Sequence, residues 1–373
     1  MLRRFPIYWR VKLEQQFKMA DIETLYNEAL ILLQELISIP SYSREETSTA
    51  NAIEKFFSKQ TIPVNRHLNN VWAVNQYFDP QKPTLLLNSH HDTVKPNAGY
   101  TKDPFAPFIE ADKLFGLGSN DAGASLVSLI AAFIHYYPQQ HLKYNIVLAA
   151  TAEEEISGLN GIAALIPLIP SPAFAIVGEP TLLNLAIAER GLLVIDASTK
   201  GIAGHAAREE GDNALYKAIE DIQWIRQYQF DRVSEWLGPV KMTVTSFHTD
   251  NKQHNVVPAT ADFIIDIRVN ELYSFDEILT ILSANLRSEF APRSTRLKST
   301  GIPVDHPIVQ AGINLGKTCY GSLTTSDKAL MPFPALKVGP GDSARSHTAD
   351  EFVYLHEIKN GIEFYIKLLK QVL

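Results

Sequence analysis

Short apolar segments that end abruptly in polar or glycine residues recur along this chain. They are PTLLLNSHHD (83–92), YNIVLAATAE (144–153), FAIVGEP (174–180) and PALKVGPGD (334–342). Segments of this kind are typical of parallel strands that are buried on both faces of a sheet. Helix candidates such as ASLVSLIAAFIHYY (124–137) lie between them. The alternation therefore predicts an α/β domain with a mostly parallel sheet.

Residues 187–300 follow a different pattern. In this segment LLVIDAST and MTVTSFHT alternate polar and apolar residues, as strands with one solvent-facing side do. The predicted elements are strands at 192–199, 240–248, 260–269 and 295–300 and helices at 212–228 and 274–288. Their order, β-α-β-β-α-β, is the ferredoxin-like split βαβ arrangement. Because 373 residues exceed what a single core usually supports, we predict a main domain formed by 19–186 and 301–373, with an inserted α+β domain at 187–300.

Charge and composition exclude several classes of protein. The formal net charge of −7 and the pI of about 5.9 argue against a nucleic-acid partner, which usually requires a basic face. The longest strongly apolar stretch, LVSLIAAFI at 126–134, is about half of the ~20 residues that a membrane-spanning helix needs. The single cysteine, Cys319, fits a reducing compartment. We therefore expect a soluble, cytoplasmic protein with no membrane partner.

The first eighteen residues, MLRRFPIYWRVKLEQQFK, require separate treatment. They are basic, but they lack the uninterrupted apolar region and the cleavage site of a signal peptide. Met19 directly precedes an amphipathic segment with helical periodicity. Our hypothesis is that Met19 is the natural start, and an intact mass that includes Met1 in protein from the native source would contradict it.

Histidine and acidic residues lie just past the ends of predicted strands or at the start of a predicted helix. They are His90, Asp92, Asp121 in GLGSNDAGA, Glu153 to Glu155, Glu179 and His347. Ligands of open α/β sheets bind at such strand ends. Without compensation each buried charge would cost several kcal/mol, so a bound cation is expected. Mixed histidine and carboxylate ligands favour Zn, Mn, Co or Fe(II) over Ca or Mg, and their number favours two metals that share a carboxylate.

Each of these motifs, taken alone, has a simpler interpretation. A run of three glutamates is most often a solvated helix face. A His-x-Asp pair is commonly a local hydrogen bond, and GLGSNDAG is commonly a turn with a helix cap. The shared site is favoured because all of them occur at corresponding ends of successive strands.

Six motifs together resemble a known family. They are SHHDTV (89–94), GLGSNDAGA (116–124), TAEEE (151–155), VGEPT (177–181), GIAGHAAR (201–208) and GPGDSARSH (339–347). The set is similar to the dinuclear zinc amidohydrolases that include acetylornithine deacetylase and succinyl-diaminopimelate desuccinylase. The resemblance extends from about residue 20 to the C-terminus. It implies a catalytic main domain, an inserted domain that acts as a dimerisation lid, and two divalent metals, with zinc favoured and cobalt or manganese as alternatives.

The resemblance also implies the metal ligands. His90 and Glu179 bind one metal, Glu155 and His347 bind the other, and Asp121 bridges the two. Glu153 stands where the family usually has aspartate, and we expect it to be structural.

Further roles follow from the same resemblance. Asp92 orients His90, since the two-residue period of a strand points both side chains the same way, whereas His91 faces away. Glu154 is the general base, which takes a proton from the metal-activated water and delivers it to the leaving amine. His205 reaches from the lid of the partner subunit of a homodimer to stabilise the oxyanion.

The substrate predictions rest on four positions. Arg190, Asn255 and Arg268 match positions that hold the substrate carboxylate in relatives, a task that suits guanidinium groups. Ser326 lies in TTSDKAL (324–330), which resembles the Thr-Ser-Asp of the desuccinylase branch. The expected substrate is a small N-acyl amino acid.

The motifs leave three functions of different kinds to consider. Our first choice is hydrolysis of N-acetylornithine in arginine biosynthesis, and the alternatives are N-succinylornithine, N-acetylcitrulline or N-succinyl-diaminopimelate. The second is a dipeptidase or carboxypeptidase of the same family. The third is a non-catalytic binding protein, against which the presence of Glu154 argues, because binding alone needs no base.

Overall fold

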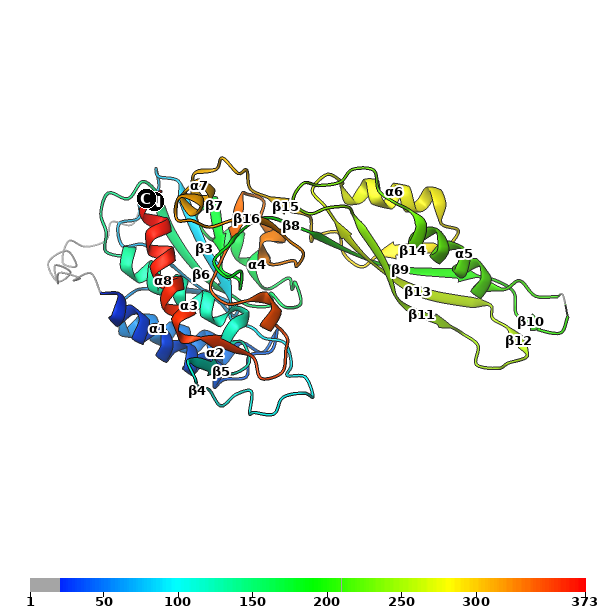
Figure 1. The fold of residues 1–373 in the computed structure, drawn as a ribbon, viewed down its shortest axis with the longest axis horizontal. Helices are drawn as coiled ribbons and strands as arrows, with labels where there is room; N and C mark the ends of the chain where they lie inside the picture. The colour runs from blue at the N-terminus through cyan, green and yellow to red at the C-terminus, as the bar shows by residue number, and fades with distance from the viewer. Residues whose placement is uncertain (1–20, 209) are drawn as a thin grey trace, which may run out of the picture.

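The computed structural model describes residues 21–208 and 210–373, so the hypothesis about Met19 lies outside the described residues. Figure 1 shows a large body, from which a narrower arm extends to one side. The body contains a nine-stranded sheet and the arm a separate four-stranded sheet. The predicted α/β fold class is confirmed. The strands of the body sheet are parallel at its centre, as predicted, but not at its edges.

The body sheet has the order β1-β2-β6-β3-β7-β17-β8-β15, and β16 also pairs with β8. Its central strands β6, β3, β7 and β17 run parallel, while the pairs at β1, β2 and β15 are antiparallel. The strand bounds are β1 Asn65–His67, β2 Asn70–Val74, β3 Thr84–His90, β6 Asn145–Thr151, β7 Pro172–Val177, β8 Leu185–Glu189, β15 Thr300–Gly301, β16 Cys319–Ser322 and β17 Ala335–Lys337.

Helices cover both faces of this sheet, and a small sheet lies beside it. The helices are α1 Ile22–Ile37, α2 Thr47–Lys59, α3 Ala124–Tyr136, α4 Ile162–Leu165, α7 Pro307–Asn314 and α8 Leu355–Lys370. Short helical turns lie at Ser119–Gly123, Ile166–Leu168, Asp327–Leu330 and Ser343–Arg345. The small sheet has the order β18-β5-β4, with β4 Phe108–Glu110, β5 Lys113–Phe115 and β18 Phe352–Tyr354.

Strand alternation divides the apolar side chains of the body between two cores. Leu85 and Leu87 of β3 belong to the larger core, which includes buried residues of α1, α3 and α8. Leu86 points the other way, into a core that it shares with Ile162 of α4. Full burial of a leucine stabilises a fold by roughly 1.5–3 kcal/mol, so β3 is held firmly from both sides. The strand that ends at His90 is therefore a rigid support.

The arm has its own core, which centres on residues such as Leu193, Ile195 and Ile265. Its sheet order is β11-β13-β9-β14, and all of its pairs are antiparallel. The bounds are β9 Gly191–Lys200, α5 Ala214–Gln227, β11 Lys241–Thr249, β13 Thr260–Val269, α6 Phe275–Asn285 and β14 Glu289–Pro292, with β10 Gly204–His205 and β12 Val256–Val257 paired at the tip. The order along the chain is the predicted β-α-β-β-α-β.

Two predicted positions in this region need correction. The last strand of the arm is β14 at Glu289–Pro292, so the predicted strand at 295–300 is wrong. Alternating exposure continues past Pro292 to Leu297, and a two-residue period alone could not mark the end of the strand. The predicted boundary at residue 187 falls inside β8, which belongs to the body sheet. We propose the two-domain division with the arm as the inserted domain, which begins at β9.

None of the helices in the described ranges combines the length and the apolar character that a membrane crossing requires.

Candidate metal centre

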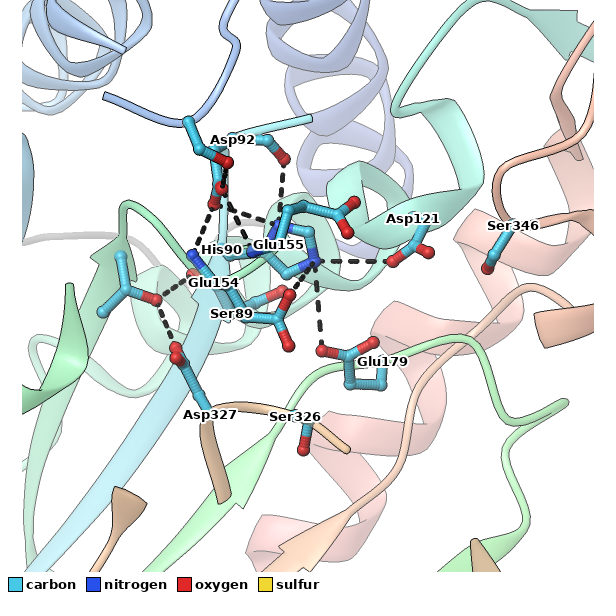
Figure 2. Close-up of polar contacts among 12 residues, drawn as sticks. Ser89, His90, Asp92, Asp121, Glu154, Glu155, Glu179, Ser326, Asp327 and Ser346 are labelled. Carbon is cyan, nitrogen blue, oxygen red and sulfur yellow. Dashed lines mark hydrogen bonds and ion pairs between the residues drawn. The ribbon is translucent and has the colours of Figure 1, made fainter. Parts of the chain in front are cut away.

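The predicted ligands come from neighbouring strand ends of the body sheet. His90 is the last residue of β3, Glu154 and Glu155 follow β6, and Glu179 follows β7. Because β6 and β7 both pair in parallel with β3, their carboxyl ends lie at one edge of the sheet. Figure 2 shows these side chains gathered around His90, with Asp121 beside them.

The imidazole of His90 lies at the centre of this cluster. Its Nε2 atom is 3.4 Å from Asp121 Oδ1 and 3.9 Å from carboxylate oxygens of both Glu154 and Glu179. This nitrogen is buried and has no hydrogen-bond partner among the described residues. A buried nitrogen without a partner is costly unless something else binds it, and imidazole is the commonest metal ligand in proteins. The residues therefore fit a metal ion at this position.

Asp121 lies between the two histidines of the cluster. Its Oδ1 atom faces His90, whereas its Oδ2 atom is 3.6 Å from Nε2 of His347. His347 Nε2 is also 3.0 Å from Glu155 Oε2. The two oxygens of one carboxylate thus face two separate sets of ligands, which is the arrangement that a bridging ligand needs.

The structure contains two overlapping groups with metal-ligand geometry. Potential ligand atoms of His90, Asp121 and Glu155 lie within 4.8 Å of one another, and so do those of His90, Glu154 and Glu179. The second group includes Glu154, for which the family resemblance implies the role of base. Its geometry therefore allows two roles for Glu154, as a base or as a ligand.

Burial and like charge raise the pKa values of the glutamates Glu154, Glu155 and Glu179 in this cluster. Burial is the main reason that the pKa of Glu179 rises to about 8, although nearby Lys337 opposes the shift. Burial also raises the pKa of Glu154 well above its ordinary value, and the charges of Glu179 and Asp327 add to the effect. Without a cation such a cluster retains protons. A cation bound among these carboxylates would offset their mutual repulsion and lower their pKa values.

Asp92 fastens several parts of the cluster. One of its carboxylate oxygens is 3.4 Å from His90 Nδ1, and the backbone carbonyl of Asp92 is 3.0 Å from the same nitrogen. The carboxylate also accepts hydrogen bonds from the backbone N–H groups of Glu154 at 3.1 Å and Glu155 at 3.2 Å, and from the hydroxyl of Ser43 at 2.7 Å. Asp92 therefore contacts His90 as predicted, and it also anchors the loop that carries both glutamates.

His91 and Glu153 point away from the cluster. The ring nitrogens of His91 lie 2.9 Å from the Thr49 hydroxyl and 2.9 Å from the Asn69 carbonyl, and burial lowers the pKa of His91 to about 4. The carboxylate of Glu153 accepts hydrogen bonds from the side chain and backbone of Asn160 at 2.8 and 3.2 Å. Neither residue faces the candidate ligands, in agreement with the sequence analysis.

The structure does not bring His205 to the cluster within one chain. His205 lies in β10, at the end of the arm that is farthest from the body in Figure 1. It is exposed, and its Nδ1 atom accepts a hydrogen bond of 3.1 Å from the backbone of Ala207. Asn255, which is predicted to hold the carboxylate of the substrate, lies beside His205. The backbone carbonyl of Asn255 accepts a hydrogen bond of 2.9 Å from the N–H of Ala206. Both roles remain predictions that involve a partner subunit.

The other predicted substrate residues already have partners. Arg190 donates to the carbonyl of Leu237, and Arg268 donates two hydrogen bonds, of 2.8 and 3.0 Å, to Asp266. Burial and the charge of Arg268 both lower the pKa of Arg190. The hydroxyl of Ser326 is buried and donates to Glu189 at 2.7 Å. Their contacts with a substrate remain predictions.

Three buried charged residues near the cluster were not predicted from the sequence. Asp327 accepts hydrogen bonds from Asn88 at 2.9 Å and Thr151 at 2.7 Å. Lys337 is 4% exposed, and its Nζ atom is 3.1 Å from Thr324 Oγ1. Glu351 accepts hydrogen bonds from the backbone of the Asp121 loop. Asp327 and Lys337 lie in the segments 324–330 and 334–342, whereas no motif indicated Glu351.

Comparison with known proteins supports the family resemblance. The model of the peptidase family M20/M25/M40 matches residues 86–371, which is more than half of the chain. A succinyl-diaminopimelate desuccinylase of Acidiphilium cryptum (strain JF-5) is 31% identical over 202 residues, which cover 52% of this chain and 54% of that protein. The aligned part thus spans about half the length of this relative.

Two solved structures share the fold. Aminopeptidase PepT from Bacillus cereus ATCC 10987 has a TM-score of 0.76 at 17% identity and covers 95% of this chain and 100% of that chain. The YXEP protein of Bacillus subtilis, described as a dinuclear metal binding peptidase, has a TM-score of 0.69 at 12% identity and covers 93% of this chain and 98% of that chain. Taken with the family match over residues 86–371, these findings show that the chain belongs to the peptidase family M20/M25/M40.

Proposed function

We propose that this protein is a metal-dependent amidohydrolase that cleaves the amide bond of an N-acyl amino acid. The observation that carries this proposal is the buried, unpartnered Nε2 atom of His90, which faces the carboxylates of Asp121, Glu154 and Glu179. The mixed nitrogen and oxygen ligands favour zinc, with cobalt or manganese as alternatives. When bound, the metals lower the pKa of a water molecule and polarise the substrate carbonyl.

The two candidate metal sites share Asp121. His90 and Glu179 complete one site, and Glu155 and His347 complete the other. The separate orientation of the two Asp121 oxygens supports this division. The name of the structurally similar Bacillus subtilis protein, a dinuclear metal binding peptidase, agrees with a count of two.

Glu154 is the proposed general base. Its carboxylate accepts a proton from the attacking water while the water oxygen bonds to the acyl carbon. It then donates the proton to the amine nitrogen as the carbon–nitrogen bond breaks. The carboxylate of Glu154 lies 3.9 Å from Nε2 of the ligand His90, so it is close enough to a metal-activated water to serve both steps. Asp92 holds the backbone of Glu154 and so limits the movement of this group.

N-succinyl amino acids are the substrates that the comparisons favour. The relative from Acidiphilium cryptum is named a succinyl-diaminopimelate desuccinylase, and so is one from Buchnera aphidicola, which is 28% identical over 278 residues. The segment 324–330 also resembles the desuccinylase branch. The alternative of an N-succinyl substrate therefore has better support than the first choice, N-acetylornithine in arginine biosynthesis.

A substrate panel tests this proposal. We expect the zinc- or cobalt-loaded protein to hydrolyse N-succinyl derivatives of diaminopimelate, ornithine, citrulline or lysine with a higher kcat/KM than the matching N-acetyl compounds. Dipeptides belong in the same panel, because similar structures include an aminopeptidase. Faster cleavage of dipeptides would favour a peptidase, and no hydrolysis of any amide by the loaded protein would contradict the proposal.

We also propose that the active unit is a homodimer in which His205 serves the site of the partner. His205→Ala should then lower kcat by about 10²–10³-fold, the usual cost of losing one donor to an oxyanion. Metal content should not change, because the five proposed ligands of each site come from one chain and do not include His205. His248→Ala is the matched control, since His248 is another histidine of the arm and its ring lies 2.9 Å from the hydroxyl of Ser246. Loss of metal in His205→Ala would make His205 a ligand instead.

Mixed dimers provide a second test of the same role. His205→Ala and Glu154→Gln are each expected to be inactive as pure dimers. In a mixed dimer, the His205→Ala chain supplies Glu154 and its partner supplies His205, so one of the two sites is complete. Random exchange of equal amounts should restore about one quarter of wild-type activity, because about half of the dimers are mixed. No recovery after verified exchange would show that His205 does not act across the interface.

A further inference from the structure

Glu351 forms an unusual set of contacts with the loop that carries Asp121. Its side chain is 2% exposed and accepts hydrogen bonds from three backbone N–H groups. The donors are Gly118 at 3.0 Å, Asn120 at 2.8 Å and Asp121 at 2.9 Å. The backbone carbonyl of Glu351 accepts a fourth bond, of 2.9 Å, from Gly116. One residue thus fixes the backbone on both sides of Gly118 and at Asp121 itself.

The backbone of the Asp121 loop is shaped to receive an anion. Gly118 has a φ of 76°, a left-handed conformation, and a Cβ atom at this position would lie 2.6 Å from Thr93 Cγ2. The left-handed turn at Gly118 lets the N–H groups of Gly118, Asn120 and Asp121 point to one side, where they form an anion-binding concavity. The carboxylate of Glu351 fills this concavity.

Two further hydrogen bonds join the Asp121 loop to the segment that precedes His347. The side chain of Asn120 donates to the carbonyl of Asp342 at 3.1 Å and accepts from the Asp342 N–H at 3.0 Å. His347 lies between Asp342 and Glu351 in the sequence. The segment that carries His347 is therefore attached to the Asp121 loop on both sides of this histidine.

We propose that Glu351 is a positioning residue that joins the Asp121 loop to the His347 segment and so holds both ligands in place before a metal binds. This inference rests on the proposed metal centre. The side chain of Glu351 contacts the backbone of a ligand and is not itself a ligand. Asp121 and His347, from the two joined segments, both belong to the second proposed metal site. We therefore expect the loss of Glu351 to weaken metal binding most at that site. The site of His90 and Glu179 shares only Asp121 with them.

The test is a zinc titration of metal-free Glu351→Gln by calorimetry. The amide keeps the size of the side chain but has only one acceptor oxygen, so its NH₂ group must face either the N–H of Gly118 or the N–H groups of Asn120 and Asp121. We expect one binding step to weaken by about 10–100-fold, the usual effect of losing a residue that orients a ligand, and the other step to change less. This readout does not depend on turnover.

Asp221→Asn is the matched control. Asp221 is a buried carboxylate of the arm that accepts backbone N–H bonds from Arg287 at 3.1 Å and Ser288 at 2.9 Å. It lies far from the ligands, so its loss should lower the melting temperature and leave both zinc-binding steps unchanged. If Glu351→Gln behaves like this control, or binds zinc like the wild type, the inference is wrong. If the wild-type protein binds no zinc, the proposed metal centre itself fails.

A measurement on the wild-type protein covers the case in which Glu351→Gln does not fold. Hydrogen exchange of the amides of Gly118, Asn120 and Asp121 in metal-free protein should be as slow as in the buried strand β3. Exchange as fast as in exposed loops would show that Glu351 does not hold the loop before metal binding, and would overturn the inference.

Discussion

Glu154→Gln should lower kcat by about 10²–10⁴-fold while both metals stay bound. The amide has nearly the same size as the carboxylate but cannot take the proton of the attacking water, and a well-placed general base contributes about this much to a rate. The measurement is steady-state kinetics of the zinc-loaded variant together with its metal content. KM should change little, because the missing interaction is made in the transition state.

Glu153→Gln is the control for this variant. Glu153 precedes Glu154 in the chain, but its carboxylate is bound to Asn160 and points away from the cluster. We expect Glu153→Gln to keep turnover within a few-fold of the wild type and to lose stability only. Retained activity in Glu154→Gln would remove Glu154 from the role of base. Loss of one metal in that variant would instead identify Glu154 as a ligand, as the second group of ligand atoms allows.

Removal of the metals should abolish the hydrolytic activity of the protein and lower its melting temperature. The cluster gathers several carboxylates within a few ångströms of His90, and their mutual repulsion is offset by the bound cations. A metal ion at a free concentration of 100 times its Kd stabilises the folded state by about 2.7 kcal/mol, so two bound ions have a large combined effect. The test compares thermal melting before and after treatment with a chelator, and readdition of zinc should restore both properties. An unchanged melting temperature after verified removal would contradict this part of the account.

The metal-free protein should also lose stability as the pH rises. The carboxyl of Glu179 has a pKa of about 8 in the folded state against 4.5 ordinarily, so between these values the folded chain holds a proton that the unfolded chain has released. The free energy of unfolding therefore falls with rising pH across this window. His347 acts in the same direction, because its hydrogen bond with Glu155 raises its pKa from 6.5 to about 9. Bound metal should flatten the dependence, which melting curves between about pH 5 and pH 9 would measure.

The parallel core and its ligands could be predicted because both follow from short-range patterns. A buried strand that ends in a polar residue is visible in the sequence, and parallel pairing then brings the ends of β3, β6 and β7 to one edge. The two-residue period of a strand also separated His90 and Asp92 from His91. These inferences need no knowledge of distant contacts.

Other parts of the site depend on contacts between distant segments. Glu351 binds a loop about 230 residues earlier in the chain, and a single glutamate in TADEF has no local sign of burial. Asp327 is similarly satisfied by Asn88 and Thr151, which lie on two different strands. The role of His205 involves a second chain, which neither local patterns nor the contacts within one chain can place.

The most direct test of the central claim is an anomalous difference map at the zinc edge, from crystals of this protein grown with zinc. We expect two peaks, one next to His90 and Glu179 and the other next to Glu155 and His347, with Asp121 in contact with both. A single peak, or peaks away from these residues, would contradict the proposed two-metal centre.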